Sequence, residues 1–185
     1  ALPIYEIWQH LISTTLPSLL TNTLWLSLGV IVGTSLLGVS LAWFTSVYRF
    51  PGYRFFSWAL FLPLAIPAYV IAFVALGTFD YTGPVQTSLR HWFNSDLLWF
   101  PDIRSGPGVA IVMTLAFYPY VYLLSRDAFL TQGKRLLEVA QSLGFTRQQG
   151  FFRVVLPMAR PWIVAGIMLA LMETLADFGT VSIFN

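Results

Sequence analysis

The chain has 185 residues, of which 57% are hydrophobic and only 10% are charged, and its formal net charge is +2. Soluble domains carry about 25% charged residues, so the composition excludes an ordinary soluble domain and favours an all-α protein that crosses a membrane several times. The absence of cysteine excludes disulfides and thiolate metal sites. Because the sequence lacks an initiator Met and a signal-peptide pattern and ends in an apolar run, we expect it to be part of a longer membrane protein.

Two long uncharged segments occupy the first half of the chain. A bilayer is crossed by about 20 apolar residues, so we predict a first membrane span over residues 22–48 and a second over residues 55–79. A Pro-Gly pair between them predicts a turn. Pro63 and Pro67 predict a kink in the second helix.

The second half contains two further predicted spans, with polar segments before and between them. Residues 80–107 are polar and turn-rich, with a short interfacial helix expected in VQTSLRHWF. A third span is predicted over 108–130 and a fourth over 161–185, beginning at a proline, a favourable first helical residue. A polar insert over 131–160 separates them.

The positive charges predict the orientation in the membrane. Four spans would place two of the ten Lys and Arg residues, Arg90 and Arg104, on one side. The other side would hold Arg49, Arg54, Arg126, Lys134, Arg135, Arg147, Arg153 and Arg160. Cytoplasmic loops carry the excess of positive charge, so we expect residues 131–160 to be cytoplasmic.

The insert itself has the pattern of two short helices joined by a turn. Gly144 is suited to the position after a helix end, Thr146 and Gln149 fit a capping box for a second helix, and Pro157 is expected to end that helix. The apolar face of the first helix would consist of Leu136, Leu137, Ala140 and Leu143. That of the second would consist of Phe151, Phe152, Val155 and Leu156.

The string EVAQSLGFTRQQGFFRVVLP, residues 138–157, resembles the cytoplasmic EAA motif of binding-protein-dependent ABC importer permeases. The motif reads E-A-A-x-x-x-G-x9-I-x-L-P, and Val139 and Val154 stand where Ala and Ile are usual. The matching residues are Glu138, Ala140, Gly144, Leu156 and Pro157.

This resemblance implies a type I, MetI-like helical bundle in the cell inner membrane, surrounded by lipid. The two short helices would dock as a coupling element into a groove on an ATP-hydrolysing subunit, with Glu138 pairing with basic groups and Gly144 making the turn. The chain has no phosphate-binding G-x-x-x-x-G-K-[ST] motif. We therefore expect a separate ATP-binding subunit dimer to bind ATP and Mg²⁺, and this chain to be a permease without catalytic residues, cofactor or nucleic-acid partner. A periplasmic substrate-binding protein would deliver the cargo.

Further strings, including LPLAIPAYVIAF, FYPYVYLLSR and LMETLADFGTVS, resemble the first half of the fused ferric-iron permeases. The resemblance implies Fe³⁺ as cargo and a second permease half fused downstream. Permeases for thiamine, sulfate, polyamines or phosphonates share the motif, so these cargoes stay open as alternatives.

Two acids, Glu173 and Asp177, fall within the fourth predicted span. Spaced by four residues, they lie on one helix face, and acids inside a membrane are costly unless they face a cavity or a partner. One interpretation places them on the translocation path, where carboxylates suit a hard cation such as Fe³⁺; the other has them bond neighbouring helices or cap a break near Gly179. An ion-coupled carrier or channel using both acids is a second function class. No metal-binding triad is evident in the sequence.

Overall fold

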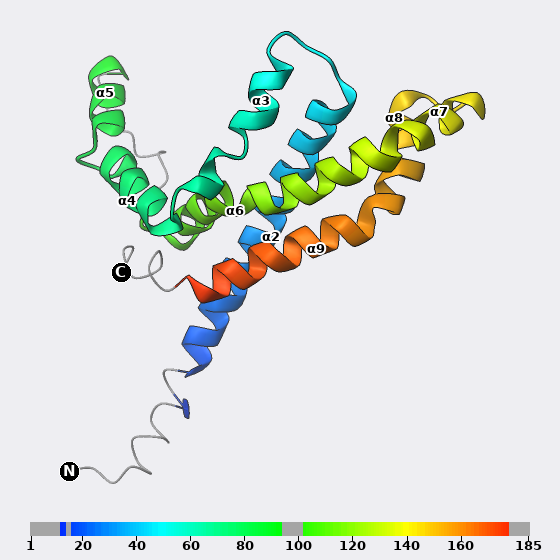
Figure 1. Cartoon of the computed structure of the whole chain (residues 1–185). Coiled ribbons are helices and arrows are strands. Elements are labelled where there is room, and N and C mark those ends of the chain that lie inside the picture. The colour runs from blue at the N-terminus through cyan, green and yellow to red at the C-terminus, as the bar shows by residue number, and fades with distance from the viewer. Residues whose placement is uncertain (1–11, 14–15, 94–101, 178–185) are drawn as a thin grey trace, which may run out of the picture.

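The structure is a computed structural model that describes residues 12–13, 16–93 and 102–177 (Figure 1). Within these ranges the regular structure is helical and contains no strand. The helices are α2 Leu16–Val47, α3 Tyr53–Ala59, η2 Leu62–Ala65, α4 Ala68–Phe79, α5 Pro84–Phe93, α6 Gly106–Ala128, η3 Phe129–Gly133, α7 Lys134–Ser142, α8 Arg147–Gly150, η4 Phe151–Val155 and α9 Leu156–Ala176. The predicted all-α class is therefore confirmed.

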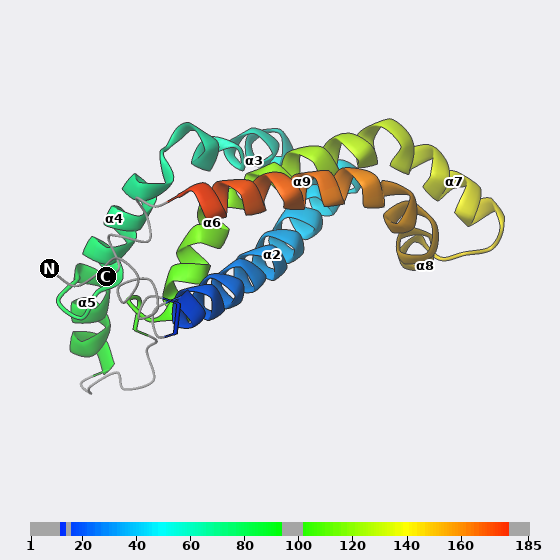
Figure 2. The same cartoon turned by 90° about the horizontal axis from the view of Figure 1, so that it is seen from below.

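The core of the protein is formed by α2, α6 and α9, which pack against one another (Figures 1 and 2). Glycines allow the backbones to approach closely. A Cβ atom added at Gly38 of α2 would lie 2.7 Å from the Cβ of Val121, and one added at Gly166 of α9 would lie 2.8 Å from the Cα of Val121. Helices α2 and α9 therefore both approach α6 closely at Val121, each through a glycine.

The second predicted segment is broken rather than kinked, so the prediction of one helix over residues 55–79 is wrong. It consists of α3, the 3₁₀ turn η2 and α4. Ile66 is extended (φ −111°, ψ 126°), as expected for a residue before proline, and Pro67 (ψ 139°) precedes α4. The stretch in this region that is long and apolar enough to cross a membrane is Ala68–Phe93. It includes α5, which confirms the short helix predicted there.

Two tyrosines of α6 hold the broken segment in place. The hydroxyl of Tyr118 donates to the backbone carbonyl of Leu60 at 3.1 Å, and that of Tyr122 donates to the carbonyl of Ser57 at 3.3 Å. Tyr122 is fully buried and also bonds the hydroxyl of Thr45 at 3.1 Å. These side chains therefore tie α2, α3 and α6 together.

The other three helical stretches that could cross a membrane are Leu16–Val47, Gly106–Ser142 and Arg147–Ala176. They overlap the first, third and fourth predicted spans but are longer than predicted. Pro119 and Pro161 lie inside α6 and α9 without ending them. The end of the fourth predicted span, residues 178–185, lies outside the described residues.

Candidate functional site

A helical hairpin projects from one end of the bundle and contains the predicted insert (Figures 1 and 2). Its first arm runs from α6 through the π-helical turn η3 into α7, and its second from α8 through the π-helical turn η4 into α9. The prediction that Pro157 ends a helix is wrong. Pro157 instead lies within the continuous helical second arm, two residues past the π-helical turn η4 and in the first turn of α9. The hairpin is therefore continuous with two core helices.

The turn of the hairpin is at Gly144, as predicted. Its φ of +86° is favourable for glycine and strained for other residues. The N–H of Gly144 donates to the carbonyl of Gln141 at 3.0 Å, and the N–H of Phe145 donates to that of Ala140 at 3.1 Å. This pair of bonds is a Schellman motif, which ends α7 and reverses the chain.

The predicted capping box at the start of α8 is also confirmed. The N–H of Gln149 donates to the hydroxyl of Thr146 at 3.3 Å, and the N–H of Thr146 donates to the side-chain oxygen of Gln149 at 3.1 Å. Two N–H groups that have no helical partner are thereby satisfied. The cap fixes the start of the second arm two residues after the turn.

Ala140 and Gly150 bring the two short helices into contact. Ala140 is 1% exposed, and a Cβ atom added at Gly150 would lie 3.0 Å from the Ala140 Cβ and 3.1 Å from the Cδ1 of Leu137. Ala140 therefore acts inside the hairpin rather than on its surface. Gly150 was not among the predicted site residues, although a glycine at the end of FTRQQG is a signal for close helix packing.

The outer surface of the hairpin combines an acid with apolar groups. Glu138 is exposed, as are Val139 (57%), Leu143 (72%) and Phe152 (65%). Leu143 and Phe152, each predicted on the apolar face of its short helix, are therefore exposed rather than packed. We call these four residues the tip surface. Leu156 and Pro157 are half-buried at the base of the hairpin and do not belong to it.

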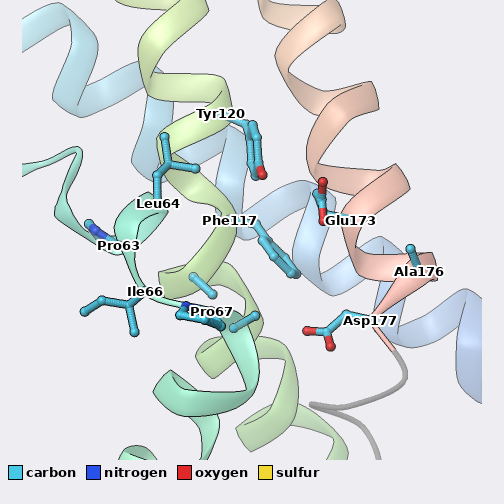
Figure 3. Close-up of a pocket in the computed structure, with 11 residues that line it drawn as sticks. Pro63, Leu64, Ile66, Pro67, Phe117, Tyr120, Glu173, Ala176 and Asp177 are labelled. Atoms are coloured by element: carbon cyan, nitrogen blue, oxygen red, sulfur yellow. The ribbon is translucent and has the colours of Figure 1, made fainter.

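The two predicted acids face a pocket with a volume of about 310 Å³ (Figure 3). Three separate segments line it: the break around Ile66 and Pro67, the middle of α6, and the end of α9. Tyr120 of α6 points toward Glu173 and interacts with its carboxylate. Asp177 ends α9, its N–H donating to the Glu173 carbonyl at 2.9 Å.

The lining of the pocket is acidic. Of its described lining residues, only Glu173 and Asp177 are charged, and the rest are apolar apart from Tyr120. Nowhere in the described ranges do three potential metal ligands among His, Asp and Glu come together. The pocket thus offers two carboxylates to a cation without forming a closed metal cage. Gly179, named in the alternative prediction of a cap, lies outside the described residues.

The family of binding-protein-dependent transport system inner membrane components matches residues 34–185. The chain belongs to this family. It is therefore a multi-pass inner-membrane permease component with the MetI-like helical fold, not an enzyme. The resemblance inferred from the 138–157 string is confirmed.

Three relatives transport different cargoes according to their names. The chain is 32% identical over 167 residues to the Fe(3+)-transport system permease protein FbpB 2 of Haemophilus influenzae, covering 90% of this chain and 29% of that protein. It is 31% identical over 147 residues to the sulfate transport system permease protein CysT of Escherichia coli (78% and 50% covered). It is 27% identical over 147 residues to the molybdenum transport system permease protein ModB of Escherichia coli (80% and 62% covered). The chain spans half or less of the length of the first two.

Proposed function

We propose that this chain is part of the permease of an ATP-driven ABC importer and that its hairpin is the coupling element. The carrying observation is the closed helical turn at Gly144, which presents the tip surface at the end of two core helices. An exposed acid flanked by apolar side chains fits a groove that has basic and apolar groups. A separate ATP-binding subunit would provide that groove.

The continuity of the arms supports a direct mechanical role. The first arm continues as α6 and the second as α9, without an intervening loop on either side. Closure of the ATP-binding subunits would displace the tip, and the displacement would act on the two helices that line the acidic pocket. Alternating access of that pocket would follow.

The coupling role is tested by Glu138→Lys and Gly144→Asp in the complete transporter. Each variant should lose transport by at least about tenfold, because the first reverses the charge of the tip surface and the second strains the turn. Gln141→Lys, also on α7 and exposed, is the control for an added positive charge. Membrane insertion should be retained by all three variants. Normal cargo uptake by Glu138→Lys with the ATP-binding subunit still bound would refute the assignment.

The acidic pocket is proposed as a part of the translocation path. Its wall includes backbone that is not helical at Ile66 and Pro67, and in membrane proteins such backbone is tolerated where it is buried or lines a cavity. Discontinuous helices are also typical of substrate sites in transporters. The alternative structural role of the acids is also compatible with this location, because Glu173 interacts with Tyr120 of the neighbouring helix α6 and Asp177 ends α9.

Ferric iron is the proposed cargo. Two carboxylates attract a hard trivalent cation and repel oxyanions such as sulfate or molybdate. Of the cargoes in the relatives' names, ferric iron is therefore the one that fits the charge of this pocket. A periplasmic binding protein would supply the iron, and a second permease half would complete the path.

Conservative substitution of the acids tests both path and cargo. Glu173→Gln and Asp177→Asn should each reduce uptake of radioactive iron several-fold while the ATP-binding subunit stays bound. Asp127→Asn, an acid-to-amide change at the exposed end of α6, is the matched control. Uptake of sulfate or molybdate by the unmodified transporter would overturn the iron assignment. Uptake that continues without the ATP-binding subunit and stops when the proton gradient is dissipated would identify an ion-coupled carrier instead.

A further inference from the structure

A triangle of aromatic rings lies where the hairpin meets the core. Trp43, near the end of α2, is 3.8 Å from Phe151 and 5.9 Å from Phe129 between ring centroids. The rings of Phe129 and Phe151 are 5.7 Å apart and nearly perpendicular, at 70°. The pairs that Phe129 makes with Trp43, at 84°, and with Phe151 have favourable edge-to-face geometry, whereas the rings of Trp43 and Phe151 are tilted by 34° in close contact. A side chain of α2 therefore contacts both arms of the hairpin at once.

The two phenylalanines mark the irregular point of each arm. Phe129 is the first residue of η3 and Phe151 the first residue of η4, and both are buried. A π-helical turn departs from the regular α-helical hydrogen-bond ladder and often occurs at functional positions. The two π turns contact each other. The irregular turns of the two arms therefore lie beside each other, and Trp43 contacts the first residue of each.

A second contact between α2 and the hairpin lies just beyond the triangle. Tyr48, one residue past the end of α2, is 6.3 Å from Trp43 with the rings perpendicular. The guanidinium carbon of Arg147 lies 5.3 Å from the centroid of the Tyr48 ring. The contact therefore reaches the start of α8.

We propose that Trp43 is a positioning residue that braces the two π turns, so that displacement of the tip surface is passed to α6 and α9 instead of being absorbed by bending at the base of the hairpin. The proposal rests on the coupling role proposed above for the hairpin. It assigns to α2, which carries no part of the EAA motif, a necessary share in coupling ATP hydrolysis to transport.

The test is Trp43→Leu in the complete transporter, with Trp25→Leu as control. Trp25 is on the same helix but is 70% exposed, so its loss removes a tryptophan without touching the hairpin. Trp43→Leu should leave the ATP-binding subunit bound and its ATP hydrolysis active, while cargo transported per ATP falls about tenfold. Trp43→Phe, which retains an aromatic ring, should recover most of the ratio. Transport per ATP equal to that of Trp25→Leu would overturn the proposal.

A covalent cross-link between α2 and the hairpin gives an independent test, which also applies if Trp43→Leu fails to accumulate in the membrane. Because the chain has no cysteine, a Tyr48→Cys, Arg147→Cys pair can be joined by a bifunctional thiol reagent once cysteines elsewhere in the transporter are removed. The cross-link should be tolerated in the Trp43 background and should restore transport per ATP to Trp43→Leu. A cross-link that stops transport in the Trp43 background would show that this joint must bend, and would refute the brace. Failure of the coupling role is distinguishable, because Glu138→Lys would then transport normally whatever Trp43 does.

Discussion

The two ends of the α6–α9 pair are built in opposite ways. At the hairpin end, both arms are helical up to a single glycine turn, and the turn is closed by backbone bonds and a capping box between residues three to five apart in the sequence. At the pocket end, one neighbouring segment is broken at Pro67, α9 stops at an acid, and a cavity separates them. The roles proposed above require a stiff element at the tip surface and a polar, adaptable one at the pocket. The comparison predicts that changes to the packing and the turn of the hairpin lower stability, and that polar changes in the pocket lower uptake with little loss of stability.

The largest loss of stability is expected from Gly150→Val in the hairpin. Two methyl groups would enter the contact with Ala140, where even a Cβ atom lies 3.0 Å from its neighbour, and overpacking of this kind costs about 1–3 kcal/mol. Thermal unfolding in detergent measures the effect. The double variant with Ala140→Gly should recover part of it, and a purely additive result would mean that the two residues do not limit the approach of α7 to α8.

A smaller loss, of about 1–2 kcal/mol, is expected from Gly144→Ala. No atom lies within 4 Å of the added Cβ, so the whole cost comes from the left-handed backbone. Hydrogen exchange in α7 and α8 should accelerate, while exchange in the α2–α6–α9 core stays the same. Gly77→Ala is the control, since Gly77 is helical with equally open surroundings and its change should be neutral or slightly stabilising. Equal effects of the two changes would remove the special role of the turn.

At the pocket end, Tyr120→Phe should change stability by less than about 1 kcal/mol, because the side chain is only half-buried and the ring is retained. Uptake should nevertheless fall clearly, because the hydroxyl that faces Glu173 is lost. Comparing iron uptake with thermal unfolding of the same preparation measures both. A variant that is strongly destabilised but transports normally would reverse the contrast between the two ends.

The smallest effect is expected from Asp80→Asn, at the same end of the bundle. The Asp80 carboxylate accepts a bond from Arg104 at 3.0 Å, and the side chains are 29% and 50% exposed. Exposed ion pairs contribute about 0–1 kcal/mol and are screened by salt. The difference in melting temperature from the unmodified protein should be small and should shrink further in high salt. A large, salt-independent loss would place this pair among the elements that hold the pocket together.

The hairpin could be predicted from local sequence patterns. The bonds at Gly144, Thr146 and Gln149 join residues no more than five apart in the sequence, so the local spacing of residue types was enough to predict them. Pro157 was wrongly predicted to end a helix. Proline disfavours a helix interior but does not always end the helix, and here the helical arm continues from η4 into α9. The exposure of Leu143 and Phe152 could not be predicted, because the spacing of apolar residues identifies a helix face but does not show whether another element covers it.

The pocket was only half predictable. Glu173 and Asp177 drew attention because charge is rare in an apolar run. Their surroundings did not, because Ile66, Pro67 and Tyr120 lie far from them in the sequence and meet them only through helix packing. A kink was predicted at Pro67 instead of a break. Whether the helix breaks depends on which donors reach the carbonyls of this segment, and the sequence does not show those donors.

Those donors have a consequence for biogenesis. A backbone carbonyl in a partly buried segment is costly until a donor reaches it, and the carbonyls of Ser57 and Leu60 receive theirs from Tyr122 and Tyr118. The donors lie about sixty residues later in the chain and leave the ribosome after the acceptors. The broken segment is therefore completed only when a later helix has entered beside it, so the order in which this membrane protein is synthesised is not the order in which it is finished.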